Sequence, residues 1–373
     1  MVERSVAEFF AGIGLMRLGL EGAGWETRFA HDISAEKETL YTANFGAGDF
    51  LRGDVHQLDS RLVPSVTLAT ASFPCTDLSL AGGRAGLGGK ESSAFWGFVR
   101  VLEDLSRESR LPPLVLLENV TGFLTSRGGQ DFRDALLALS RLGYAVDALI
   151  LDAAWFVPQS RQRLFVIGVQ RDFLLKTSSS LPLASRVRPK ALVDFILGNP
   201  DLGWNLTPIA GPETVVSTLA DVLEDLPDDH PDWWSRERVA YFENQTSERH
   251  RAQLSQFRSQ EGWSYATAFR RTRQGRLMAE LRTDGLAGCL RTPKGGSARQ
   301  ILVRMGDGRL DVRLLTGREC ARLMGAPDSF KLDVPLNQAL FAFGDAVCVP
   351  VVMWLARNCL NPHLGEPYPD AFP

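Results

Sequence analysis

Short apolar runs alternate with amphipathic stretches from residue 5 to residue 170, and this alternation constrains the fold more than any other feature. The helical patterns begin after Leu15 and after Ser34 and also cover 95–105 and 132–142. The apolar runs predict strands at 6–10, 26–30, 66–72, 114–117, 144–151 and 164–169. Repeated strand–helix units predict an α/β fold, with a mostly parallel sheet covered by helices on both faces.

The alternation stops near residue 172 and returns only near Thr316. The segment 201–234 has seven or more acidic side chains and no Lys or Arg, whereas arginines and aromatic residues are interleaved across 236–291. A last apolar helix is expected at 349–358, where the chain returns to the sheet. We therefore predict one domain at 1–184, an inserted smaller domain at 185–305, and a return to the first domain at 306–373.

Bulk composition narrows the class of protein. The formal net charge of -3 would argue against a nucleic acid as partner, but charge is unevenly distributed, and the 236–291 region is rich in arginine. Five cysteines without a CxxC pair disfavour a disulfide framework and a zinc site, and they fit a reducing cytoplasm. The charged Glu3, Arg4 and Glu8 exclude a signal peptide, and the apolar run at 346–356 is too short to span a bilayer.

The tripeptide Phe73-Pro74-Cys75 follows the third predicted strand. Proline lacks an N–H and forces the preceding residue into an extended conformation, so the strand should end here. Cys75 is then expected at the carboxyl edge of the sheet, where open α/β sheets bind their ligands. A small buried cysteine without chemistry is the alternative interpretation.

Gly12 and Gly14 lie between the first predicted strand and the first predicted helix. Glycines here allow the backbone to approach a ligand closely, and the amino terminus of the helix favours negative groups. A dinucleotide fingerprint would need a third glycine where Arg17 stands, so S-adenosylmethionine fits better than a nicotinamide cofactor. Asp32 ends the second strand and suits the ribose hydroxyls, while Asp54 could accept from the adenine amino group. A plain tight turn with two surface acids remains the alternative.

Six short motifs stand in one order along the chain, and together they resemble the DNA cytosine-5 methyltransferase family. The resemblance covers nearly all of the chain apart from the inserted domain. The motifs are Phe10-Ala11-Gly12-Ile13-Gly14, Phe73-Pro74-Cys75, Glu118-Asn119-Val120, Gln159-Ser160-Arg161-Gln162-Arg163, Arg318-Glu319-Cys320-Ala321-Arg322-Leu323 and Gly344-Asp345-Ala346-Val347.

The resemblance implies a Rossmann-like, S-adenosylmethionine-dependent methyltransferase with an inserted target-recognition domain at 185–305. Cys75 would attack C6 of a flipped-out cytosine, so that C5 can take the methyl group. Glu118 would bind the N3 and N4 edge of the base, Arg163 its O2, and Arg161 would assist or hold the loop. Pro74 and Asn119 complete the catalytic set. The cofactor-binding set is Phe10, Ala11, Gly12, Ile13, Gly14, Asp32, Ile33, Asp54, Val55, Asp345 and Ala346.

The resemblance also implies double-stranded DNA as the partner, and a monomer with a cognate restriction or defence nuclease encoded elsewhere. A glycine-rich loop after Cys75 is interpreted as a lid that closes over the flipped base. We predict that the acidic 201–232 segment faces away from DNA. The predicted DNA-binding residues are Ser79, Arg84, Lys90, Arg270, Arg271, Arg273, Arg276, Lys294 and Arg299.

Four positions depart from the family pattern, and two other functions stay open. Leu15 replaces a glycine, Glu8 an aspartate, Ile33 an aromatic residue, and Asp345 an asparagine near the methionine moiety. One alternative is an RNA cytosine methyltransferase acting on a tRNA, although the Cys-Phe-Thr signature of such enzymes is absent. The other is a non-catalytic DNA-binding relative. The recognised bases and the biological use of the methyl mark are not readable from the sequence.

Overall fold

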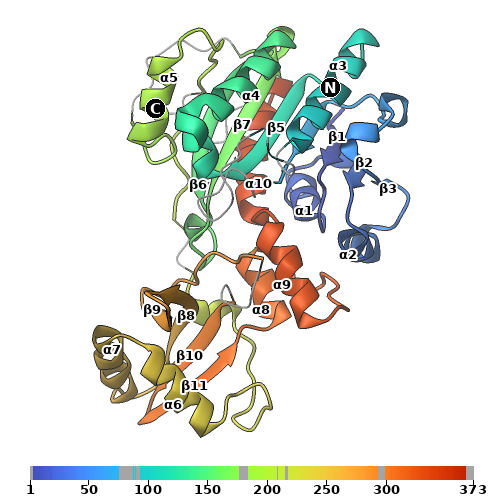
Figure 1. Ribbon diagram of the computed structural model, residues 1–373. Coiled ribbons are helices and arrows are strands. Elements are labelled where there is room, and N and C mark those ends of the chain that lie inside the picture. The colour runs from blue at the N-terminus through green and yellow to red at the C-terminus, as the bar shows by residue number, and fades with distance from the viewer. Residues whose placement is uncertain are drawn as a thin grey trace. The chain divides into compact units, whose positions relative to one another are not determined.

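The structure is a computed structural model that describes residues 3–74, 87, 89, 93–175, 184–207, 209–214, 217–292 and 299–366. The chain divides into two compact units. The first comprises Met1–Asp152, Gln162–Glu213 and Val349–Pro373. The second comprises Ala153–Arg161 and Thr214–Cys348. Figure 1 draws the elements of both units.

A seven-stranded sheet forms the centre of the first unit, in the order β3-β2-β1-β4-β5-β7-β6. Strands β1 to β5 are parallel where they pair, whereas β7 runs antiparallel to both β5 and β6. The predicted α/β class with a mostly parallel sheet is confirmed. The strands are β1 (Ser5–Phe9), β2 (Glu26–Asp32), β3 (Phe50–Arg52), β4 (Leu68–Ala71), β5 (Leu114–Val120), β6 (Tyr144–Asp152) and β7 (Gln162–Gln170).

Helices cover both faces of this sheet (Figure 1). On one face, α3 (Ala94–Arg107) and α4 (Gln130–Arg141) enclose a core in which Phe9 and Phe98 meet with ring centroids 5.0 Å apart. Elsewhere, α1 (Leu15–Glu21) packs on α10 (Val349–Leu355) so tightly that a Cβ on Gly19 would lie 2.5 Å from Val352. Helix α2 (Ala35–Phe45) lies between β2 and β3 in the sequence of the first unit.

Residues 184–213 pack with the first unit. Arg188 and Asp147 form a buried ion pair of 2.7 Å, and the Asn205 N–H donates to the Val146 carbonyl. Helix α5 (Lys190–Gly198) adds its apolar side to the same core as α3 and α4. These compact units therefore have limits other than 184, 185, 305 and 306; the predicted functional division rests on motif order and charge, and it stays a prediction.

A four-stranded antiparallel sheet forms the second unit, in the order β11-β10-β8-β9. Helices α6 (Arg236–Gln245) and α7 (Glu248–Arg258) share one apolar core with it. Two further helices, α8 (Gly317–Leu323) and α9 (Leu336–Asp345), belong to this unit. The strands are β8 (Ser264–Arg273), β9 (Arg276–Arg282), β10 (Ile301–Gly306) and β11 (Arg309–Leu314).

One helical stretch of the described residues, Leu336–Leu364, is long and apolar enough to cross a membrane by length and composition. It is longer than the 346–356 run that the sequence indicated, because several helical segments follow one another there. However, 67% of its most apolar part is buried, which is the state of a core helix in a soluble protein. Its apolar character is therefore explained by packing inside the protein.

Candidate active site

Two of the predicted catalytic motifs meet at the carboxyl edge of β4 and β5. Phe73 and Pro74 follow β4 directly, and Cys75 lies outside the described residues. Asn119 on β5 donates through Nδ2 to the Phe73 carbonyl at 3.1 Å, and its Oδ1 accepts from the Val120 N–H at 2.8 Å. Asn119 therefore fixes the backbone that leads into Cys75, from the neighbouring strand.

Glu118 and Arg163 meet at the same edge. In the antiparallel pairing, Glu118 lies opposite Phe165 and Arg163 opposite Val120, so the two side chains are diagonal neighbours on one face of the sheet. Arg163 Nε lies 3.1 Å from Glu118 Oε1, and the side chains are only 16% and 8% exposed. A carboxylate and a guanidinium held this way present both acceptors and donors to a planar heterocycle.

The route by which Arg163 reaches this edge differs from the sequence expectation. The sequence predicted a mostly parallel sheet with Cys75 at its carboxyl edge, but Arg163 stands at the amino end of β7. Because β7 runs antiparallel to β5, its amino end lies at the carboxyl end of β5. Strand β5 also continues through Glu118 and Asn119 to Val120, beyond its predicted end at 117.

Arg161 has a different environment from Arg163, although they belong to one motif. It is 2% exposed and belongs to the second unit. Its guanidinium donates to the carbonyls of Leu290 (2.8 Å), Gly344 (3.0 Å) and Ala346. A Cβ on Gly344 would lie 2.4 Å from the backbone nitrogen of Thr292, so this approach requires glycine. Of the two expected roles, this geometry favours holding the loop.

The other motif residues of the second unit also bind backbone. Gln159 is fully buried, donates to the Leu323 carbonyl at 2.8 Å and accepts from the Leu290 N–H at 3.0 Å. Glu319 forms a capping box with Thr316 and a buried ion pair with Arg313. Glu319 also accepts from the Glu224 N–H at 2.9 Å, so both side chains connect segments that are distant in sequence and form part of the unit's framework.

The glycine loop has the left-handed backbone that its sequence suggested. Phe10, Gly12 and Gly14 have φ of 58°, 59° and 83°. A Cβ on Gly14 would lie 2.3 Å from the ring of Phe45, so both the conformation and the packing require glycine. Asp32 then ties the loop to α2, because its two carboxylate oxygens accept from the N–H groups of Gly12 and Ser34, each at 2.9 Å.

The residues around this loop fit an adenosine group. Helix α1 begins at Gly14 without a side-chain cap, so its amino terminus can face a polar ligand. Ile33 follows Asp32 and is 69% exposed, which offers an apolar surface beside the carboxylate. Asp54 caps the short helix Val55–Gln57 through the His56 N–H, and Val55 is buried. Asp345 and Ala346, also in the predicted set, belong to the second unit.

Two residues near the loop were not among the predicted site residues. Arg17 donates to Glu21 and to the Tyr41 hydroxyl, and its guanidinium lies 4.7 Å from the centroid of the Phe45 ring. Glu8 is 2% exposed, and neither of its carboxyl oxygens has a hydrogen-bond partner among the described residues. Burial raises the pKa of Glu8 to about 8, so it holds a proton at neutral pH. The sequence signal that could have identified Glu8 is a charged residue inside a strand-like apolar run.

The predicted DNA-binding residues fall into three groups. Arg271 and Arg276 are exposed on the β8–β9 hairpin, where Arg273 pairs with Glu280. Arg270 donates to Gln245, and Arg299 donates to Asn337. Those that lie outside the described residues are Ser79, Arg84, Lys90 and Lys294. The acidic segment is partly neutralised, because Asp228 pairs with Arg304 and Arg309.

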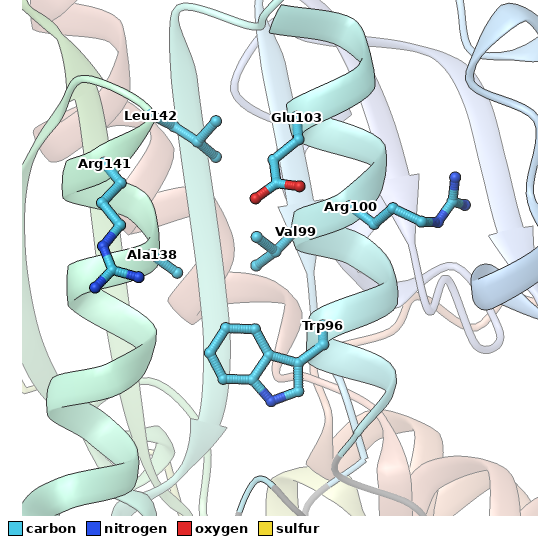
Figure 2. A pocket seen from close by; sticks show the side chains of 7 residues that line it. All are labelled: Trp96, Val99, Arg100, Glu103, Ala138, Arg141 and Leu142. Carbon is cyan, nitrogen blue, oxygen red and sulfur yellow. The ribbon is translucent and has the colours of Figure 1, made fainter.

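A separate pocket of about 270 Å³ lies between α3 and α4 (Figure 2). Figure 2 shows Trp96 at one end, Val99 opposite Ala138 in the middle with Arg141 beside it, and Leu142 near Glu103 at the other end. None of the predicted catalytic or cofactor-binding residues lines it. It is a depression between two surface helices and contributes nothing to the site at the sheet edge.

Comparison with known proteins agrees with this arrangement. Residues 4–361 match the family described as C-5 cytosine-specific DNA methylase. The Type II methyltransferase M.HaeII of Haemophilus aegyptius is 26% identical over 97% of this chain and 94% of its own length. M.NlaX of Neisseria lactamica is 29% identical over 95% of each chain.

Solved structures share the fold. The Dnmt2 methyltransferase of S. pombe is 22% identical and has a TM-score of 0.65, with 98% of this chain and 100% of that chain covered. A putative DNA modification methyltransferase from an E. coli prophage is 20% identical, with a TM-score of 0.59 over 97% and 99%. Together with the match across almost the whole chain, the ordered motifs show that this protein belongs to the C-5 cytosine-specific DNA methylase family and is a DNA (cytosine-5)-methyltransferase.

Proposed function

We propose that this enzyme transfers a methyl group from S-adenosylmethionine to C5 of a cytosine flipped out of a specific duplex DNA sequence, through a covalent bond between Cys75 and C6. The observation that carries the proposal is the Glu118–Arg163 pair at the edge that leads into Cys75. The pair supplies donors and acceptors for one planar base, and Asn119 positions the backbone next to the nucleophile.

The reaction would begin when the Cys75 thiolate adds to C6 and the ring electrons move toward C5. S-adenosylmethionine, when bound, supplies an electrophilic methyl group on a sulfonium sulfur. After transfer to C5, loss of the C5 proton to a base and expulsion of the Cys75 thiolate restore the ring. At the end, the methyl group is on C5, the C5 proton is on the base, and Cys75 is again a free thiolate.

Glu118 and Arg163 would act on the base in that first step. A protonated Glu118 would donate to N3 and accept from the N4 amino group, which stabilises the charge that develops as sulfur adds. Arg163 would donate to O2, and its permanent charge suits this carbonyl. The short distance between them means that a single base edge can reach both side chains.

The cofactor would be held by the first-unit loop. The backbone of 10–14 would contact its polar part, Asp32 the ribose hydroxyls, Ile33 the adenine face, and Asp54 with Val55 the adenine edge. Asp345 and Ala346 remain proposed from their motif alone. Because Asp32 already accepts two N–H bonds, its orientation is fixed before the cofactor binds.

The setting of the reaction follows from the relatives. Several are Type II methyltransferases, so we propose a role in restriction–modification or phage defence, with a cognate nuclease encoded elsewhere. We also propose that the protein acts on double-stranded DNA in the cytoplasm and that it is a monomer. We also propose that the 185–305 segment recognises the target.

A methylation assay tests the proposal. Wild-type protein and Cys75→Ala would be incubated with radiolabelled S-adenosylmethionine and either duplex DNA or tRNA. Label is expected in DNA with the wild type and in neither substrate with Cys75→Ala, which should still bind DNA. Label in tRNA but not in DNA would support the RNA alternative, and label from Cys75→Ala would refute the nucleophile.

Trapping separates catalysis from binding alone. Duplex DNA that contains 5-fluorocytosine should form a covalent adduct with the wild type, because fluorine at C5 cannot leave as a proton does. A non-catalytic DNA-binding relative would leave no adduct. Bisulfite sequencing of DNA from cells that express the protein would then identify the modified cytosine and its sequence context.

A further inference from the structure

Two arginines of the second unit share one tryptophan ring. Trp234 is 9% exposed and packs edge-on against Phe242 beneath α6. The Arg238 guanidinium carbon of α6 lies 4.0 Å from the Trp234 ring centroid, and that of Arg270 from β8 lies 5.3 Å from the same centroid. Both guanidinium groups therefore stack on the same indole.

Neither charge is neutralised by a carboxylate in the part of the chain that the structure describes. Arg270 donates from Nε to Gln245 Oε1 at 2.9 Å, and Arg238 makes no ion pair there. Gln245 is itself 5% exposed, and its Nε2 donor has no acceptor among the described residues. The cluster thus offers two guanidinium groups and an unpartnered amide donor, with no negative charge between them.

The opposite end of the same sheet is a control within the molecule. Arg304 and Arg309 also stack on a tryptophan, with guanidinium carbons 4.4 Å and 5.1 Å from the Trp263 centroid. There, Asp228 and Asp311 pair with both arginines. Stacking of arginine on tryptophan also occurs on Trp233, and the arginines on Trp233 and Trp263 all have carboxylate partners among the described residues.

The two positive charges on this indole repel one another, and an anion bound between them would relieve the repulsion. In line with this, burial and the charge of Arg238 lower the pKa of Arg270. The paired N–H donors of a guanidinium group match the oxygens of a phosphate. Stacking on the indole restricts both arginine side chains before a ligand binds, so binding costs less side-chain entropy. A tyrosine on the same helix, Tyr241, is 58% exposed and leaves the approach open.

We propose that Arg238, Arg270 and Trp234 form a binding site for one phosphate group of the DNA backbone. The identity of the phosphate rests on the proposed function, because DNA is the polyanion that this enzyme would meet. The site would fix the register of the second unit on the duplex without reading a base, and it adds Arg238 and Trp234 to the predicted contacts.

The salt dependence of DNA binding tests the site. Arg238→Gln and Arg270→Gln, singly and together, would be compared with wild type on a short mixed-sequence duplex between about 50 and 200 mM salt. The double variant should flatten the slope of log Kd against log salt by about 1. Arg309→Gln is the matched control, because its arginine also stacks on tryptophan but is neutralised, and its slope should equal that of wild type.

Further measurements separate the possible outcomes. Thermal unfolding confirms that each variant is folded, and Arg270→Lys should retain the slope because it keeps the charge. A folded double variant with the wild-type slope would overturn the site. If inorganic phosphate raises the unfolding midpoint of wild type but not of the double variant, while the DNA slope is unchanged, the site binds free phosphate and the DNA assignment is wrong.

Methyl transfer is measured on the same proteins. A wild type that fails to methylate DNA, with a slope that still depends on Arg238 and Arg270, would reject the proposed chemistry and leave this site standing. A methylating wild type whose slope does not depend on the two arginines would reject the site and leave the proposed chemistry standing.

Discussion

Arg161 and Arg163 are two residues apart, yet they belong to regions that use arginine for opposite purposes. Arg163 shares the β5–β7 edge with Glu118, in the first unit, and pairs with that side chain. Arg161 is enclosed in the second unit and donates to the carbonyls of Leu290, Gly344 and Ala346. We propose that Arg163 binds the substrate, whereas Arg161 binds backbone carbonyl groups.

The difference shows that a motif shared across a family can serve two tasks at once. In the second unit, Gln159, Glu319 and Arg161 satisfy buried backbone groups, and such groups are costly when left unpaired. At the sheet edge, Glu118 and Arg163 pair with one another, and under the proposed function a planar base would contact both. Substitutions at the edge should therefore change rate, and substitutions in the framework should change stability.

Glu118→Gln should have the largest effect on rate. Glutamine keeps the size of the side chain but cannot shuttle between acid and carboxylate, so methyl transfer should fall by about 10²–10⁴-fold, the usual contribution of a general acid. The thermal unfolding midpoint should change little. Single-turnover transfer to duplex DNA measures the rate; a variant as fast as wild type would remove Glu118 from the chemistry.

Arg163→Lys should have the next effect. Lysine retains the charge but loses the fork that can reach Glu118 and a base carbonyl together, so transfer should slow by about 10-fold to 100-fold. Unfolding should again be almost unchanged, since the side chain is not part of a buried backbone network. A variant that loses stability but keeps its rate would place Arg163 with the framework and break the contrast with Arg161.

The sequence predicted the α/β class and most strands and helices of the first unit, but not α5, and the catalytic roles of the motifs stay predictions. It did not predict that Arg163 enters from an antiparallel strand, because an apolar run such as 164–169 has no direction of its own. Nor could it show that Asp228 has counterions at Arg304 and Arg309, since those partners lie more than seventy positions away and meet only on folding.

The sequence also could not show that Arg161 and Arg163, in one motif, have different environments. Arg161 and Arg163 look alike in the sequence, and only strand pairing and burial separate them: Arg163 lies on a sheet face beside Glu118, whereas Arg161 is enclosed before β7 begins. The missed Glu8 has a similar cause. A charged residue within 6–10 signals something unusual, but the absence of a partner for its carboxyl group appears only once β1 is packed.

Arg161→Lys should act mainly on stability. A lysine can satisfy only part of the carbonyl set at Leu290, Gly344 and Ala346, and the loss of two or three buried bonds should lower the free energy of unfolding by about 2 kcal/mol. The rate per folded molecule should stay within a few-fold of wild type. Denaturant unfolding and active-site titration by 5-fluorocytosine trapping separate the two quantities; a normal stability with a large loss of rate would contradict the framework role.

Glu8→Gln should change only the pH dependence of stability. Burial raises the pKa of Glu8 from 4.5 to about 8 in the folded state, so between these values the unfolded chain loses the proton while the native protein keeps it. The native state then binds more protons, and wild-type stability should fall as pH rises from about 5 to about 8, by an amount on the order of a few kcal/mol. Glutamine cannot ionise, so the variant should lose this decline. Denaturant melts across that range measure it, with Glu8→Asp as the ionisable control; parallel curves for wild type and Glu8→Gln would show that the buried carboxyl group is charged in the folded protein and has a partner beyond the described residues.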